Sequence, residues 1–328
     1  MDGREHYAFI LVSALLPLFG VVAAVVLLWN ELVGPTDLVI FGIMYVIAGL
    51  GVSTGYHRLL AHRSFRTTRP LRIFFAAAGA MAGQGPPVIW VAHHRRHHRV
   101  ADKPGDPHSP YSDEEPGLRG AVKGLWHAHL GWLFDRGLSS DPMRYCPDVL
   151  RDRDMRVISR YFVWFVVGGV VLPGLLGLVF TGSLFGAFTG ALWGGLVRFF
   201  FANHITYAVN SIGHYFGRRR FATPDESRNV GWLALFSFGE AWHNNHHAFP
   251  RSASHGMRWW EVDISALVIR LLERLGLATH VIRIDRDRQE QKAVAWEKLG
   301  GGRHARSTPD KPLANRARTA TVGIVDVE

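Results

Sequence analysis

Four apolar stretches of this chain are each long enough to cross a lipid bilayer as a helix. They cover residues 8–29, 37–56, 161–181 and 184–209. The hydrocarbon core of a bilayer is about 30 Å thick, and a helix of roughly 20 residues crosses it. We therefore expect an all-α integral membrane protein with four transmembrane helices. The first stretch is longer than the apolar core of a cleavable signal peptide, so we expect it to be retained.

Basic residues are distributed unevenly among the segments that link these stretches. The links at residues 30–36 and 181–184 contain no Lys or Arg, whereas residues 57–160 and those from 210 onward are rich in both. Cytoplasmic segments carry an excess of Lys and Arg. We therefore expect both large segments and both termini to face the cytoplasm. This topology requires a weaker apolar stretch at residues 71–91 to lie in the membrane interface without crossing it.

The C-terminal part of the chain differs in composition from the rest. Residues 281–328 are polar and rich in Arg and Gly, without a sustained apolar period. We expect a helix fragment and then a largely disordered tail, following a membrane domain at residues 1–280. The net charge of +10 would suit nucleic acid or anionic lipid. Because the basic residues flank apolar runs and match no nucleic-acid-binding motif, we expect a lipid bilayer and no nucleic acid as partner.

Eight of the 18 histidines lie in three clusters, each of which follows an apolar stretch. The clusters comprise His57 and His62, then His94, His97 and His98, and finally His243, His246 and His247. In an α-helix, positions i, i+3 and i+4 share one face, so the second and third clusters can each point into one volume. Positions i and i+5 differ by about 140°, so we expect His57 and His62 to bind different ions. Imidazole suits Zn, Cu, Fe and Ni, so the ligands alone do not name the metal.

The other histidines are weaker candidates. We expect surface or satisfied core roles for His6, His255, His280 and His304. Metal binding and a supporting or structural role both stay open for His93, His108, His127, His129 and His204. The single cysteine, Cys146, excludes an internal disulfide and a cysteine-based metal site.

The clusters and the text around them resemble the motifs of the membrane fatty acyl desaturases, in particular their stearoyl-CoA (delta-9) branch. The matching text is GYHRLLAHRSF at 55–65, HRRHH at 94–98, DPH at 106–108, NSIGH at 210–214 and GEAWHNNHHAFP at 239–250. The resemblance covers roughly residues 35–260. It implies four spanning helices under a helical cytoplasmic cap that holds a di-iron site.

The resemblance also implies the ligands of each iron, including two that the spacing of the clusters does not reveal. One iron would be bound by His57, His94, His243 and His246, with Asn210 acting through a water molecule. The other would be bound by His62, His97, His98, His214 and His247. This division agrees with the separation of His57 from His62 that the α-helical spacing predicts.

The implied activity is O2-dependent insertion of a cis double bond, expected at carbon 9, into a long saturated acyl-CoA. Positions that line the family's substrate tunnel correspond to Gln84, Trp90 and Thr206, and Tyr45 would close the tunnel and limit the chain length. For the CoA phosphates, the sequence offers a basic surface comprising Arg58, Arg95 and Arg99. Ala92-His93 stands where animal-type members carry Arg-Asp, and Tyr207 where a Trp is usual. Both departures concern the CoA contacts and not the metal site.

Electrons for such a reaction must come from a separate protein, because the chain has no nucleotide-binding fingerprint, haem motif or cysteine cluster. A ferredoxin with its reductase, or cytochrome b5, would serve. The lack of a fused cytochrome domain and of an ER-retrieval ending favours a bacterial plasma membrane. Three alternatives stay open: an acyl-lipid desaturase, a fatty acyl hydroxylase on the same iron site, and a histidine-rich membrane metal transporter. A transporter would need polar ligands within the bilayer.

Overall fold

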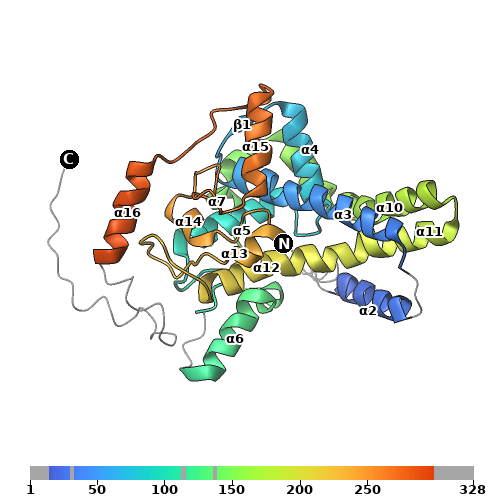
Figure 1. The fold of residues 1–328 in the computed structure, drawn as a ribbon, viewed down its shortest axis with the longest axis horizontal. Coiled ribbons are helices and arrows are strands. Elements are labelled where there is room, and N and C mark those ends of the chain that lie inside the picture. The colour runs from blue at the N-terminus through green and yellow to red at the C-terminus, as the bar shows by residue number, and fades with distance from the viewer. Residues whose placement is uncertain (1–14, 30–32, 112–115, 136–138, 299–328) are drawn as a thin grey trace.

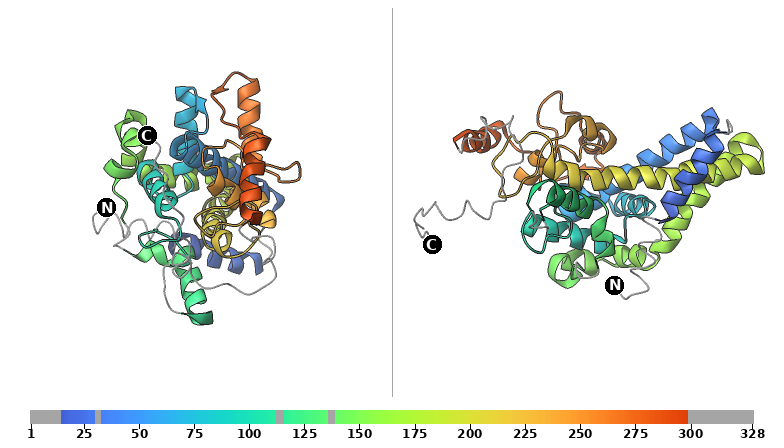
Figure 2. Two further views of the ribbon diagram at one scale, coloured as in Figure 1. Left: turned by 90° about the vertical axis from the view of Figure 1, so that its left-hand side faces the viewer. Right: turned by 90° about the horizontal axis from the view of Figure 1, so that it is seen from below.

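Helices dominate the computed structural model, which describes residues 15–29, 33–111, 116–135 and 139–298. Within those ranges the one sheet is a two-residue pairing, in which β1 (Arg66–Thr67) runs antiparallel to β2 (Ala278–Thr279). Long helices project to one side of a cap that is built from shorter helices and loops (Figures 1 and 2). The fold is therefore all-α, with the elongated shape expected of a membrane protein.

Three helices of the described residues are long and apolar enough to span a membrane. They are α3 (Pro35–Leu50) continued by the π-helix η2 (Gly51–Ala61), then α10 (Phe162–Thr181), and finally α11 (Leu184–Gly190) continued by η5 (Ala191–Val197) and α12 (Arg198–Tyr215). The helix α10 packs against α11 and η5, and α3 packs against α10 and η5 (Figure 1).

The spans differ in length from those expected. The stretches at 37–56 and 184–209 belong to helices that continue to Ala61 and Tyr215, so these helices extend into the cap and carry histidines with them. The stretch at 161–181 agrees with α10. The helix α2 (Leu16–Trp29) forms the end of the first expected span, and residues 8–14 of that span lie outside the described residues.

The weaker apolar stretch at 71–91 is divided between two helices, α4 (Arg69–Ala80) and α5 (Pro87–Val100). The chain turns between them with Gly83 and Gly85 at φ 73° and 106°, a left-handed conformation that favours glycine. Pro87 then occupies the first turn of α5, where its missing N–H costs no hydrogen bond. Neither helix is long enough to cross a bilayer, and α5 carries the second histidine cluster into the cap.

The helix α4 lies unusually close to η2 because glycines face each other at the contact. A Cβ atom placed on Gly51 would lie 2.2 Å from the backbone nitrogen of Gly79. The largest buried apolar cluster surrounds this contact and includes Tyr56, Phe65 and Phe75. The π-helix that carries the first histidine cluster is therefore held rigidly against its neighbours.

The remaining helices of the described residues form the cap. They are α6 (Gly117–His129), η3 (Gly131–Phe134), α7 (Pro142–Tyr145), α8 (Pro147–Arg151), α9 (Arg153–Arg160), α13 (Gly231–Phe236), α14 (His243–Ala248), α15 (Ile264–Arg274) and α16 (Arg286–Lys298). The helix α16 falls in the segment expected to hold a helix fragment before a disordered tail, and residues 299–328 lie outside the described residues.

Candidate metal centre

The first histidine cluster lies at the end of the long helix that begins with α3, with His57 on the π-helix η2 and His62 directly after it. The N–H of His62 donates to the carbonyl of His57 at 3.0 Å, which is an i→i+5 hydrogen bond. This wider turn brings the two rings together, with centroids 4.8 Å apart. The structure thus places His57 and His62 in one candidate group, whereas α-helical spacing predicted that they would bind different ions.

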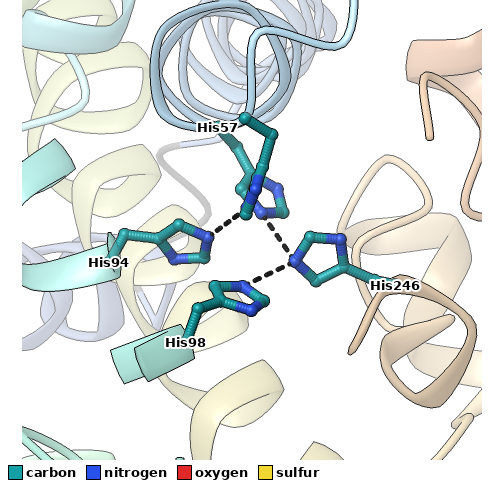
Figure 3. A group of neighbouring side chains, drawn as sticks. His57, His94, His98 and His246 are labelled. Atoms are coloured by element: carbon teal, nitrogen blue, oxygen red, sulfur yellow. Dashed lines mark hydrogen bonds between the residues drawn. The ribbon is translucent and has the colours of Figure 1, made fainter. Parts of the chain in front are cut away.

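Nine histidines from four separate elements converge in the cap. The helix η2 leads into the first cluster, α5 carries the second, α14 carries the third, and His214 lies in the last turn of α12. Figure 3 shows His57, His94, His98 and His246 pointing toward one centre. The Nε2 atom of His246 lies 3.1 Å from that of His57 and 2.8 Å from that of His98.

The nine histidines form two groups, and within each group the ligand atoms lie within 4.8 Å of one another. The five-histidine group comprises His57, His62, His94, His98 and His246. The four-histidine group comprises His97, His214, His243 and His247. The two groups adjoin, since the ring centroids of His98 and His247 are 4.4 Å apart. Such a donor set fits two neighbouring metal ions that favour imidazole.

This grouping corrects the division implied by the family resemblance. His62 and His98 join the group of His57, and His243 joins the group of His214. The π-turn accounts for His62. For His98, the cause is that consecutive residues on α5 differ by about 100°, so His97 and His98 face different groups. Asn210 lies one turn before His214 on α12 and lines a cavity together with His57, His94 and His243, so this cavity is shared by histidines of both groups.

Four of these histidines are each oriented by a carboxylate. The Nδ1 atom of each ring faces one acidic side chain, in the pairs His57–Glu240, His97–Asp106 (2.9 Å), His214–Asp102 (2.7 Å) and His247–Asp225 (2.9 Å). A carboxylate at Nδ1 fixes the hydrogen on that nitrogen and leaves Nε2 free to bind a metal. None of these four acids was predicted from the sequence as part of the site. Asp106 and Glu240 stand in the quoted DPH and GEAWH text, whereas no local motif marks Asp102 or Asp225.

The electrostatics favour neutral imidazole at three rings of the five-histidine group, whereas at His214 the effect of burial is outweighed by Asp102, which raises the pKa to about 9. Burial lowers the pKa of His94, His98 and His246 well below the usual histidine value, and the neighbouring histidines lower it further. A second proton on any of these rings would place a charge in a desolvated site beside other imidazoles. Neutral imidazole is the form that binds metal, so the protein holds these side chains ready for ligation.

A cavity adjoins the two groups and brings together four residues that the resemblance assigned to the substrate tunnel. Tyr45, Gln84, Trp90 and Thr206 all line it, together with His57, His94 and His243. The Nε2 of Gln84 donates to Oγ1 of Thr206 at 2.8 Å, and Trp90 stacks on His94 with centroids 5.1 Å apart. The hydroxyl of Tyr45 donates to the carbonyl of Phe236 at 2.7 Å, which ties α3 to the end of α13.

The three arginines expected to contact the substrate do not line this cavity. Arg58 is fully buried and forms ion pairs with Glu240 and Asp263. Arg95 donates to Asp148 at 2.6 Å and also to two backbone carbonyls of η2. The guanidinium groups of Arg58 and Arg95 are thus paired with acceptors inside the protein, in contrast to the expectation that they would face CoA phosphates. Arg99 is exposed near the end of α5.

Comparison with known proteins agrees with this arrangement. The family model for fatty acid desaturases matches residues 35–280. A hex-5-enoyl-[acyl-carrier protein] acetylenase of Moorena producens (strain JHB) is 41% identical to this chain over 282 residues, which cover 86% of this chain and 87% of that protein. Delta-9 acyl-lipid desaturase 1 of Arabidopsis thaliana is 41% identical over 239 residues, 73% of each chain. The sn-1 stearoyl-lipid 9-desaturase of Anabaena variabilis is 38% identical over 244 residues, 74% of this chain and 82% of that protein.

Proposed function

The chain belongs to the fatty acid desaturase family, and from this premise we propose that it inserts a cis double bond into the acyl chain of a membrane lipid, using O2. It is therefore an oxidoreductase of lipid metabolism. The observation that supports this proposal most directly is the meeting of two histidine groups with an adjacent cavity. The double bond is proposed at carbon 9, because two of the similar proteins are named for that position.

Two iron ions are proposed as the metals. The first would be held by the five-histidine group, and the second by the four-histidine group with Asn210 acting through a water molecule. Bound iron would supply, together with O2, the oxidising power needed to break C–H bonds of unactivated methylenes. The protein supplies His94, His98 and His246 in neutral form, orients four other histidines through carboxylates and excludes bulk water by burial.

Residues of the cavity are proposed to place the target methylenes beside the metals. Trp90 packs on His94, and the hydrogen bond between Gln84 and Thr206 links the α4–α5 turn to α12. Fixing a chain of single bonds in one conformation removes most of the entropy cost of reaching the reactive geometry. Tyr45 is proposed to limit the length of the bound chain, since its hydroxyl ties α3 to Phe236 at the cavity wall.

The internal ion pairs of two arginines favour a lipid-bound acyl chain over acyl-CoA as the substrate. Arg58 and Arg95, which were expected to contact CoA phosphates, are committed to internal carboxylates and carbonyls. Similar proteins named acyl-lipid desaturases add support. Acyl-CoA is the alternative, supported by the exposed Arg99 and by an acyl-CoA 5-desaturase of Anemone leveillei that is 40% identical over 243 residues.

Labelled substrates distinguish these carriers. Membranes containing the protein, a ferredoxin and its reductase are supplied with either labelled stearoyl-CoA or labelled stearoyl phospholipid, with acyl transfer between the two blocked. We expect a monounsaturated product from the phospholipid. Conversion of stearoyl-CoA alone would refute the lipid-bound substrate, and an alcohol product would show a hydroxylase.

The proposed setting is a bacterial plasma membrane crossed by four helices, with α2 as the end of the first. Both termini and the metal centre would face the cytoplasm, where a separate ferredoxin or cytochrome b5 delivers electrons to the cap. Expression in a desaturase-deficient host, with donor proteins supplied, tests the activity. A new monounsaturated fatty acid and two irons per chain are expected, whereas exchangeable zinc without oxidation of lipid would indicate a metal transporter.

A further inference from the structure

His255, which the sequence assigned to a surface or satisfied core role, is a fully buried imidazole beside the five-histidine group. It lies in the loop between α14 and α15. Its ring centroid is 4.4 Å from that of His246 and 5.3 Å from that of His57. Both neighbours belong to the same group, so His255 adjoins one half of the metal centre.

The orientation of the His255 ring is fixed by its contacts. Its Nδ1 lies 3.3 Å from Nη2 of Arg58, and because a guanidinium only donates, Nδ1 accepts and the hydrogen sits on Nε2. The backbone N–H of His255 donates to Asp263 at 2.7 Å, and its carbonyl accepts from Nδ2 of Asn245 at 2.9 Å. The residue is thus held through its main chain and through Nδ1 of its ring, whereas the buried Nε2 has no hydrogen-bond partner among the described residues.

We call the buried set Arg58, Glu240, His255 and Asp263 the Arg58 cluster. Arg58 donates to Asp263 at 3.0 Å and to Glu240 at 3.1 and 3.2 Å. Glu240 is also the carboxylate that holds Nδ1 of His57. The cluster therefore ties the first histidine cluster to chain segments on both sides of the third, and each of its charges has a partner, as burial requires.

His246 lacks the support that other histidines of the centre receive. Its Nδ1 is buried and has no hydrogen-bond partner among the described residues, whereas His57, His97, His214 and His247 each face a carboxylate. The orientation of the His246 ring must therefore come from packing. The ring of His255 lies against it at an interplanar angle of 38°.

We propose that His255 is a positioning residue for the five-histidine group, whose ring packs on His246 and holds it in the orientation that binds the metal ion of this group. The inference rests on the two-iron assignment of the proposed function. It goes further by tying His255 to one of the two ions. Loss of the His255 ring is therefore predicted to affect one iron and spare the other.

The test compares His255→Ala with Asp225→Asn, which removes the carboxylate behind His247 in the four-histidine group. Both proteins are purified with ⁵⁷Fe, and iron content and Mössbauer spectra are measured. We expect about one iron per chain in each variant instead of two, because supporting partners of metal ligands typically contribute 10–100-fold in affinity. The spectral component that disappears is expected to differ between the two variants.

A ring-preserving variant separates packing from folding. His255→Phe keeps an aromatic face against His246 but removes the acceptor for Arg58, whereas His255→Asn keeps an acceptor and removes the ring. We expect His255→Phe to retain close to two irons and His255→Asn to retain about one, with both proteins folded by circular dichroism. This comparison tests the positioning role of the His255 ring even if the His255→Ala protein does not fold.

Two results would overturn the inference. One is a His255→Ala or His255→Asn protein that holds two irons with the wild-type Mössbauer spectrum. The other is equal loss of both spectral components, which would show a general structural role. A wild-type protein without iron would refute the proposed function itself, so the two failures are distinguishable.

Discussion

At the scale of single residues, the metal centre depends on acidic side chains that bind no metal themselves. Asp106 illustrates this, because both of its oxygens lie within 3.0 Å of Nδ1 of His97 and it also accepts from the backbone N–H groups of Asp102 and His108. Burial alone would raise the pKa of Asp106, yet His97 and His108 hold it well below its usual range. The carboxylate is therefore ionised and able to orient His97 at neutral pH.

Asp106→Asn is predicted to weaken iron binding by about 10–100-fold without unfolding the protein. The amide keeps the shape of the side chain but removes the charge that favours hydrogen on Nδ1 of His97. Iron retained against a graded series of chelator concentrations measures the effect. The control is Asp154→Asn, since Asp154 pairs with Arg69 on the cap surface away from the histidines. Equal iron retention in both variants would contradict the role of Asp106.

Residue types and spacing were sufficient to find eight histidines of the centre, and the family resemblance added His214. The placing of His62 in the group of His57 was not predictable, because it depends on whether η2 winds as an α- or a π-helix. The sequence HRLLAH is compatible with both. The partners of Arg58 and Arg95 were not predictable either. The sequence around an arginine does not reveal whether its side chain faces solvent or pairs with a carboxylate that is distant in sequence.

At the scale of elements, the contact between η2 and α4 determines where the first cluster lies. Gly51→Ala is predicted to lower the thermal unfolding midpoint and the iron content, because the new Cβ would lie 2.2 Å from Gly79 N and 2.8 Å from the Cβ of Ala78. Gly42→Ala on the same long helix meets no atom within 4 Å. Since alanine favours helix over glycine by about 1 kcal/mol, this control is expected to be neutral or stabilising. Thermal unfolding in detergent measures both, and a similar change in the two variants would contradict the prediction.

A second contact between elements links α5 to α8 and predicts a dependence on pH. Burial raises the pKa of Asp148, but hydrogen bonds from Arg95 and Arg63 lower it well below its usual value. A depressed pKa stabilises the folded state above the unfolded value of about 3.9, and this stabilisation is lost as pH falls through the folded value. Asp148→Asn is therefore expected to lower the unfolding midpoint at pH 7. The difference from wild type should shrink steadily below about pH 4, and a difference that grows there would refute the prediction.

Element boundaries were predicted well where apolar composition alone decides them and poorly where it does not. The helix α10 is apolar throughout and agrees with the expected span at 161–181. The long helices that contain η2 and α12 continue through polar residues such as His57 and His214, because their rings are paired with Glu240 and Asp102 in the cap. A prediction from hydropathy alone therefore places the ends of these helices too early.

At the scale of the whole molecule, apolar and basic residues are segregated to opposite ends. The link between α10 and α11 is Gly182–Ser183 without a charge, whereas the cap carries the paired arginines Arg58, Arg63 and Arg95. Segregation of this kind orients a membrane protein through the excess of cations on the cytoplasmic side. In the proposed orientation, the cap at the end of the long helices would face the cytoplasm, where a donor protein would reach it (Figure 1).

This orientation predicts which face of the membrane each end of α10 occupies. Cys146, the single cysteine, is buried, so Cys146→Ala provides a background for introduced thiols. Leu184→Cys, at a residue that is 82% exposed beyond α10, is expected to react with a membrane-impermeant maleimide in intact cells. Arg144→Cys, on the exposed surface of α7, is expected to react only after the membrane is permeabilised. The opposite pattern would place the metal centre outside the cytoplasm, and labelling of both thiols in intact cells would show that α10 does not cross the membrane.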